Sequence, residues 1–277
     1  MQTMVNGRQM TYTDEGEGLP LLFVHGFPLN RNTWARQVER FKGNYRVIAP
    51  DLRGLGGSEA SIGPVSMDEY AEDIYALLQY LATGPVILIG HSMGGYVAMA
   101  FARAYPKALR GLVLVSTKAG GDSPEAAATR RMMVDKVRVE GPSLVARAMA
   151  PRMLSVSNLD PAMAASVDGF MAYANPEGII GALLGMAERP DAGPGLGKIR
   201  VPTLVVTGAD DTLIPPGESE ALAGLIPGAK LKTIPHAGHL VAFESADTFN
   251  EVMSNWLAWG GDAPLRSMAV SVDELPG

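Results

Sequence analysis

A serine stands between glycines where two sequence patterns meet. The stretch VILIGHSMGGYVAMAFA (86–102) contains Gly90-His91-Ser92-Met93-Gly94, which fits G-x-S-x-G. The apolar run before this motif predicts a strand, and the run after it predicts a helix. In that setting the motif is typical of a sharp strand-to-helix turn that exposes a nucleophilic hydroxyl. The glycines leave room where strand and helix cross. The alternative is a small-residue turn with an incidental serine.

A serine hydroxyl needs a base to take its proton, and the chain has four histidines. His91 adjoins Ser92, where strand alternation turns its side chain away. His25 follows another apolar run, in VHGFPLN. His236 and His239 lie in IPHAGHLVAFES, between the last strand run and the last helical stretch. We predict that His239 is the base, with His236 as the alternative.

The base in turn needs an acid that fixes its tautomer and stabilises the imidazolium. The run TLVVTGADDTLIPP (203–216) ends a predicted strand and offers two aspartates. Asp211, three residues after Gly208, is placed to curl over the strand end toward His239. Asp210 is the alternative acid. The chain order Ser92, Asp211, His239 is one of the orders in which such triads occur.

Backbone amides are predicted to stabilise the oxyanion that forms when an ester carbonyl is attacked. One is the amide of Met93, directly after the serine. The second is the amide of Phe27, in His25-Gly26-Phe27-Pro28 after a strand run. Pro28 restricts Phe27 to an extended conformation, which helps to present that amide.

Composition excludes several other classes of protein. The 277 residues are 47% hydrophobic and 19% charged, which is enough apolar content for a sizeable core. The net charge of -6 and pI near 5.3 argue against nucleic-acid binding. Cysteine is absent, so disulfides and thiolate chemistry are excluded. A metal site from H-x-x-H and Glu244 is disfavoured because glycine and proline oppose a helical ligand face, and no metal is predicted.

Apolar runs alternate with helical stretches along most of the chain. Strands are predicted at 21–24, 46–50, 86–90, 112–116, 203–208 and 231–235, all as buried strands, and helices at 68–81, 93–105 and 218–225. This alternation predicts an α/β protein with a mostly parallel sheet and helices on both faces. We predict a core of 1–118 and 197–259, a helical cap of 119–196 and a C-terminal tail of 260–277.

Three helix starts are marked inside the predicted cap. Ser123-Pro124, Asp160-Pro161 and Asn175-Pro176 each place an N-cap residue before a proline. Methionines are frequent in this segment, and their side chains fill irregular apolar gaps. We expect Met132, Met133, Met149 and Met186 to roof a finite apolar pocket above Ser92.

Together, FVHGFPLNRNTW, VIAPDLRGLGGS, GHSMGGYVAMAFA, GADDTLIPP and IPHAGHLVAFES resemble the α/β-hydrolase superfamily as far as about residue 259. Within it the chain resembles small bacterial carboxylesterases related to 3-oxoadipate enol-lactone hydrolases. The resemblance implies an eight-stranded, mostly parallel sheet, a helical cap and hydrolysis of short-chain esters without a cofactor. The loop DLRGLGGS (51–58), where Leu55 replaces a frequent histidine or phenylalanine, is interpreted as structural.

We therefore predict a carboxylesterase with a small-molecule ester as substrate. The alternatives are an enol-lactone hydrolase, a perhydrolase, and a small-molecule receptor that retains the triad. An acidic lactone favours a cationic pocket, whereas residues 120–195 have seven Lys+Arg and nine Asp+Glu, a net charge of −2 that disfavours such a substrate. A single buried arginine such as Arg189 would still be able to bind it. Neither nucleic acid nor a membrane is expected as a partner, and the protein is expected to be a monomer or small homo-oligomer. With no predicted signal peptide or membrane span, we expect a cytoplasmic location.

Overall fold

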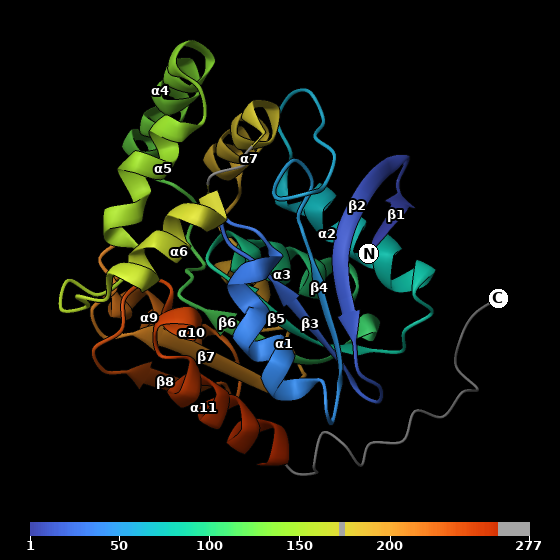
Figure 1. Cartoon of the computed structure of the whole chain (residues 1–277). Helices are drawn as coiled ribbons and strands as arrows, with labels where there is room; N and C mark the ends of the chain where they lie inside the picture. Colours follow the sequence, from blue (N-terminus) through green and yellow to red (C-terminus); the bar gives the residue numbers. More distant parts are fainter. Residues whose placement is uncertain (172–174, 260–277) are drawn as a thin grey trace.

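A single sheet of eight strands forms the centre of the described structure (Figure 1). The computed structural model describes residues 1–171 and 175–259, so the predicted tail 260–277 lies outside the described residues. The strands follow the order β1-β2-β4-β3-β5-β6-β7-β8 across the sheet. β2 runs antiparallel to both β1 and β4, and all the other neighbours are parallel. The strands are β1 (Gln2–Val5), β2 (Arg8–Glu15), β3 (Pro20–Val24), β4 (Arg46–Pro50), β5 (Val86–His91), β6 (Leu109–Val115), β7 (Thr203–Gly208) and β8 (Lys230–Ile234).

Helices cover both faces of this sheet, as the alternation in the sequence predicts. The α-helices are α1 (Ala35–Phe41), α2 (Met67–Tyr80), α3 (Met93–Ala104), α4 (Pro124–Glu140), α5 (Ser143–Met149), α6 (Pro161–Met171), α7 (Pro176–Glu188), α8 (Gly193–Leu196), α9 (Pro216–Leu225), α10 (Val241–Glu244) and α11 (Ala246–Trp259). Short 3-10 turns occur at η1 (Arg31–Trp34), η2 (Pro106–Ala108) and η3 (Ala150–Arg152). Among the described residues, no helix has the length and apolar character needed to cross a bilayer.

Alternate residues of the central strands enter two separate apolar layers. In β3, Leu22 and Val24 pack in the layer that contains α2 and α3. Leu21 and Phe23 pack in the layer that contains α1 and α11. Buried apolar residues therefore occupy both faces of β3, which explains why the strand reads as a continuous apolar run in the sequence. The predicted α/β class and the mostly parallel eight-stranded sheet are confirmed.

The parallel strands bring the predicted site residues to one edge of the sheet. β3, β5, β7 and β8 all point the same way, so the loops that follow them leave at the same edge. Phe27, Ser92, Asp211 and His239 lie in or directly after these loops. Loops beyond the carboxyl ends of parallel strands are where such sheets carry their sites.

Helices α4 to α8 lie between β6 and β7, and the described part of 119–196 contains no strand. The predicted helix starts are confirmed, because Ser123 accepts a hydrogen bond from the amide of Ala126 and Asn175 accepts one from Glu177. Gly178 of α7 lies against the core, since a Cβ there would be 1.7 Å from the carbonyl oxygen of Gly54. The domain boundaries at 118/119 and 196/197 stay a prediction.

The loop 51–58 connects neighbouring elements through hydrogen bonds and ion pairs, which agrees with its interpretation as a structural loop. The buried Asp51 carboxylate accepts hydrogen bonds from the amides of Arg31 (2.7 Å) and Gly57 (2.8 Å) and pairs with the Arg31 guanidinium. Arg53 forms an ion pair of 2.6 Å with Asp73 of α2. These bonds join the loop to η1 and α2.

One strand differs from its prediction. β8 was expected to be buried, but four of its five residues are exposed, and Leu231 keeps 39% of its surface accessible. β8 is the last strand of the sheet, so only β7 pairs with it. Its lysines are typical of an edge strand, where charge discourages pairing with another chain.

Candidate active site

Ser92 occupies the sharp turn that its motif predicts. β5 ends at His91 and α3 begins at Met93, so Ser92 alone joins strand and helix. Its backbone has φ 53° and ψ -116°, a conformation that is strained for any residue with a Cβ. A Cβ on Gly90 would lie 2.3 Å from the carbonyl oxygen of Gly94, so the crossing requires glycine. Ser92 itself remains partly exposed.

A chain of two hydrogen bonds links Ser92 to Asp211 through His239. The Nε2 atom of His239 lies 2.9 Å from Ser92 Oγ, and its Nδ1 lies 2.8 Å from Asp211 Oδ2. The second oxygen, Asp211 Oδ1, accepts hydrogen bonds from the amides of Leu213 and Ile214, both at 2.9 Å. His239 and Asp211 are buried.

Asp211 is held in its charged form. Burial by itself would raise the pKa of Asp211, but the hydrogen bond from His239 and the two backbone amides lower it below its usual value. A charged Asp211 accepts a hydrogen bond from Nδ1–H of His239 and so leaves Nε2 free to accept a proton from Ser92. This arrangement can activate a serine hydroxyl for attack on a carbonyl.

The other three histidines are not part of this chain of hydrogen bonds. His25 is buried, accepts the Leu52 amide at Nε2 (3.0 Å) and faces the Gly26 carbonyl with Nδ1 (2.8 Å). His91 is also buried, and its Nε2 donates to the carbonyl oxygen of His239 at 2.9 Å. Burial lowers the pKa of both, to about 3 for His91. His236, the alternative base, is exposed and has a φ of 54°.

Asp210, the alternative acid, faces a different partner. Its Oδ2 accepts a hydrogen bond of 2.6 Å from the hydroxyl of Ser155, in the inserted helical segment. The backbone amide of Asp210 donates to the carbonyl oxygen of Ala237 at 2.9 Å. Asp210 therefore ties the loop after β7 to that segment, and its neighbour Asp211 faces His239.

Glu244 connects two segments of the chain through hydrogen bonds, a role that was not predicted, since it was considered from the sequence only as a metal ligand. Its carboxylate accepts hydrogen bonds from the amide of Gly238 (2.6 Å), the amide of Ser155 (3.0 Å) and the side chain of Asn158 (2.7 Å). Glu244 thus joins the loop that carries His239 to the inserted helical segment. Within the described residues, no three or more histidine, aspartate or glutamate side chains are grouped to hold a metal ion.

The two amides predicted to stabilise an oxyanion belong to residues that follow Gly26 and Ser92 in the chain. Gly26 packs against the serine, since a Cβ there would be 3.0 Å from Ser92 Cβ, and Phe27 follows it. Met93 begins α3, where the first amides of a helix have no partner within the helix. Neither the Phe27 nor the Met93 amide donates to another described residue. Their role in binding an oxyanion stays a prediction.

The inserted segment packs over these loops. A small apolar cluster joins Met153, Val167 and Met171 of that segment to Leu29 and Leu240 of the core loops. Of the four methionines expected in the roof, Met149 contacts this cluster. Met133 and Met186 pack in the large layer with α2 and α3. Met132 was placed wrongly in a closed roof, because 59% of its surface is exposed.

Arg189 is the most buried arginine or lysine among the described residues. Its guanidinium donates to Asp122 (2.7 Å) and to the carbonyl oxygens of Met186 and Gly120. It also lies 3.8 Å above the centre of the Tyr96 ring. Asp122 also pairs with Arg130, so these three side chains carry one positive charge in excess, although three donors of Arg189 are already used inside the protein.

Comparison with known proteins places this fold in a family. The profile of the alpha/beta hydrolase fold family matches residues 20–246 of the chain. The chain therefore belongs to the α/β-hydrolase fold family, as the resemblance of its motifs predicts.

Several solved structures and relatives are similar over most of their length. A thermophilic esterase from Thermogutta terrifontis, solved with malate bound, is 43% identical, with 92% of this chain and 96% of that chain covered and a TM-score of 0.89. The enol-lactonase from Burkholderia xenovorans LB400 is 27% identical, with 93% and 100% covered and a TM-score of 0.87. A 2-hydroxy-6-oxononadienedioate/2-hydroxy-6-oxononatrienedioate hydrolase from Paraburkholderia xenovorans is 31% identical, with 90% of this chain and 91% of that protein covered. The predicted likeness to esterases and enol-lactonases is confirmed.

Proposed function

We propose that this chain is a serine carboxylic-ester hydrolase that acts on short-chain esters through Ser92, His239 and Asp211. The observation that carries the proposal is the pair of hydrogen bonds, 2.9 Å and 2.8 Å long, that connects a partly exposed serine to a buried aspartate through one histidine. The likeness to an esterase at 43% identity supports the same reading.

The reaction begins when the hydroxyl oxygen of Ser92 attacks the ester carbonyl carbon while its proton passes to Nε2 of His239. The charge of Asp211 stabilises the imidazolium that forms. The amides of Phe27 and Met93 donate hydrogen bonds to the oxyanion, each contributing about 3–4 kcal/mol to the transition state. The tetrahedral intermediate collapses when His239 returns the proton to the leaving alcohol.

The second half of the reaction uses the same groups with water in place of the alcohol. The acyl group is now bound to Ser92 Oγ, and His239 takes a proton from a water molecule as that water attacks the acyl carbon. The carboxylic acid leaves, and Ser92 recovers its proton from His239. Each proton that His239 accepts is passed on in the same half-reaction, so the enzyme returns to its starting state.

The main alternative enzymatic function is hydrolysis of an acidic substrate such as an enol-lactone. The enol-lactonase is a related hydrolase, and the dioate hydrolase carries a name that describes a dicarboxylate substrate. Such a substrate favours a buried cation that is free to bind it. Asp122 and two carbonyl oxygens already use three donors of Arg189, which leaves few donors for a substrate carboxylate. These hydrogen bonds favour an uncharged ester, whereas the pairing of Asp122 with Arg130 as well leaves the cluster one positive charge in excess.

A perhydrolase or a small-molecule receptor would retain the same triad, so turnover has to separate these alternatives. The test measures sustained hydrolysis of p-nitrophenyl butyrate and of an enol-lactone by the wild type and by Ser92→Ala. We expect many turnovers of the ester, slower turnover of the lactone, and a loss of about 10⁶ in kcat in the variant. Binding without turnover would support a receptor, and faster lactone hydrolysis would support the lactonase.

A further inference from the structure

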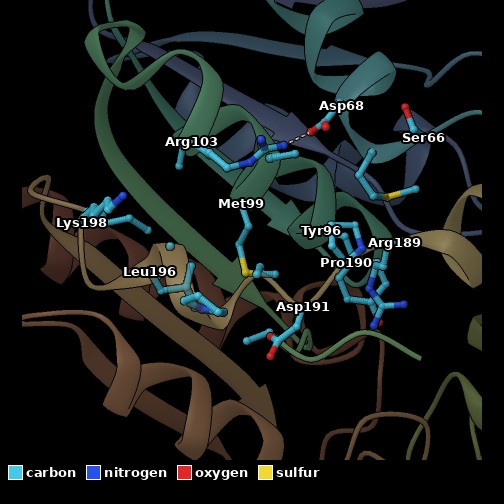
Figure 2. A pocket seen from close by; sticks show the side chains of 18 of the residues that line it. Ser66, Asp68, Tyr96, Met99, Arg103, Arg189, Pro190, Asp191, Leu196 and Lys198 are labelled. Atoms are coloured by element: carbon cyan, nitrogen blue, oxygen red, sulfur yellow. Dashed lines mark hydrogen bonds and ion pairs between the residues drawn. The ribbon is translucent and has the colours of Figure 1, made fainter. Parts of the chain in front are cut away.

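A cavity of about 810 Å³ lies beside α3, and neither Ser92 nor His239 lines it. One stripe of α3 forms a wall of this cavity, at the spacing that places residues on one face of a helix: Tyr96, Met99, Ala100 and Arg103. The stretch 188–201, between α7 and β7, supplies most of the opposite wall. Figure 2 shows Tyr96 and Arg189 together at one side of the cavity, with Met99 between them and the side where Lys198 lies.

The cavity has a structural origin in the short connection to β7. The helices that cover this face elsewhere, α2 and α3, have 14 and 12 residues. The helix that leads into β7, α8, has only four. The chain from 189 to 201 therefore covers this part of the sheet mainly as irregular structure, and the space that a longer helix would occupy stays open. A volume in this range is typical of small-molecule sites.

The charged side chains around the cavity give no reason for a charged ligand. Arg103 pairs with Asp68, and Arg189 has the partners described above. Glu69 is bound by Ser66 and Arg53. The remaining charged side chains are two acidic and two basic, and all four are exposed and therefore hydrated: Glu188, Asp191, Lys198 and Arg200. The remaining wall is largely apolar, with the buried side chain of Met99 near its middle. The lining is thus suited to an uncharged molecule.

One polar group in the wall lacks a partner. Tyr96 is 5% exposed, and no hydrogen bond joins its hydroxyl to another described residue, but the oxygen is not among the fully buried atoms that lack a partner, so it is accessible. A hydroxyl that is accessible from a cavity can exchange its hydrogen bond to water for one to an acceptor oxygen on a bound molecule. The pKa of Tyr96 is raised by burial, so the phenol stays protonated and can donate.

We propose that this cavity is a second binding site, separate from Ser92, for an uncharged and largely apolar molecule with one acceptor oxygen. An ester, a ketone or an alcohol has this chemistry. The apolar part lies against Met99 and the stretch 188–201, and the oxygen accepts the hydrogen bond of Tyr96. The proposal does not depend on the reaction at Ser92.

Two glycines of the same stretch provide a matched test. A Cβ on Gly195 or on Gly197 would meet nothing within 4 Å, but only Gly195 lines the cavity. The probe is Nile red, an uncharged apolar dye with a carbonyl oxygen, whose fluorescence rises in apolar surroundings. Full-length wild type, Gly195→Phe and Gly197→Phe are titrated with it, and circular dichroism checks that each is folded.

We expect Gly195→Phe to weaken Nile red binding at least about tenfold, because the new ring occupies the cavity, while Gly197→Phe binds like wild type. Tyr96→Phe should weaken binding about 2- to 10-fold, the effect of one neutral hydrogen bond. Equal binding by the two glycine variants would overturn the proposal, since the dye would then sit elsewhere, including at Ser92. An unchanged affinity in Tyr96→Phe would overturn the role of the hydroxyl, and absence of binding to wild type would overturn the site.

Discussion

Replacing Asp211 by asparagine keeps the shape of the side chain and changes which atoms can accept hydrogen bonds. In the wild type, Oδ1 accepts two amides, of Leu213 and Ile214, and Oδ2 faces Nδ1 of His239. In the variant the amide oxygen must stay with the two backbone donors, because an NH₂ group cannot accept from them. The NH₂ group is then directed at His239 Nδ1.

This orientation forces the wrong tautomer on the histidine. Nδ1 has to accept from the asparagine, so the ring proton moves to Nε2, which lies 2.9 Å from Ser92 Oγ. A protonated Nε2 cannot take the serine proton, and the charge that stabilises the imidazolium is also lost. The same substitution in a serine protease lowers kcat by about 10⁴, equivalent to about 5.5 kcal/mol in activation free energy. We expect a loss of that size here.

Asp210 provides the matched control, because it differs from Asp211 by one position and has a different partner. Its contact is the Ser155 hydroxyl, which an asparagine oxygen can also accept, so Asp210→Asn should retain kcat within about threefold. Both variants and the wild type are assayed with p-nitrophenyl butyrate for kcat and KM, with circular dichroism as a check of folding. If Asp211→Asn kept most of its kcat, or if Asp210→Asn lost as much, the reasoning about the tautomer would be refuted.

Three further predictions concern stability, positioning and substrate size. Burial lowers the pKa of His91 to about 3 and also lowers that of His25, so both stay neutral in the folded protein and gain protons on unfolding near pH 6.5. Because the unfolded state binds more protons, the free energy of unfolding should fall as the pH drops below about 6.5, by up to about 1.4 kcal/mol per pH unit for each histidine. Urea unfolding at several pH values measures this dependence. A free energy of unfolding that did not change with pH would contradict the prediction. Glu244→Ala removes the acceptor of the Gly238 amide and should cost about 1.5–3 kcal/mol in stability, with kcat reduced more than KM is raised. Glu244→Gln should recover part of the lost stability and part of the lost kcat. The exposed control Glu251→Ala should change neither the stability nor kcat. A Glu244→Ala variant with the stability and kcat of the wild type would show that the hydrogen bond to Gly238 is dispensable. Finally, kcat/KM for p-nitrophenyl esters should peak between acetate and butyrate and fall by octanoate. Each buried methylene adds about 0.8 kcal/mol to binding until the acyl chain reaches the apolar wall, after which steric conflict weakens binding. A steady rise of kcat/KM to palmitate would contradict a closed pocket.

Local signals in the sequence were enough to predict most of the elements that carry the site. The apolar runs before Ser92 and Asp211 are buried strands with both faces covered, and buried strands are the clearest strand signal in an α/β chain. The N-caps at Ser123 and Asn175 act within three residues of sequence, so no tertiary information is needed to recognise them. The positions of the predicted triad residues follow from the same strands.

The first two strands, β1 and β2, are missing from the predicted strands, and they lie at one edge of the sheet. β1 and β2 mix polar and apolar residues, and several of those residues face solvent. A signal was nevertheless present, since Asn6-Gly7 joins the two strands and both residues have positive φ, 48° and 75°. Asn-Gly between short strands is the strongest local sign of a hairpin.

The contacts that hold the predicted triad in place depend on tertiary structure and have no local signature. His91 binds the carbonyl oxygen of His239 across 148 positions of sequence, and Glu244 joins the loop of His239 to Ser155 across 89. The exposed position of Met132 depends on which face of α4 meets α7, and the apolar periodicity of α4 is too weak to settle that from the sequence.

The most direct measurement of the central claim is covalent labelling of the nucleophile. The wild type is treated with a serine-directed phosphonate, and the modified residue is located by mass spectrometry of the digested protein. The account predicts a single adduct, on Ser92, with loss of esterase activity in proportion to labelling, and much slower labelling in Asp211→Asn because His239 no longer accepts the serine proton. An adduct on another residue, or full activity in a protein labelled at Ser92, would contradict it.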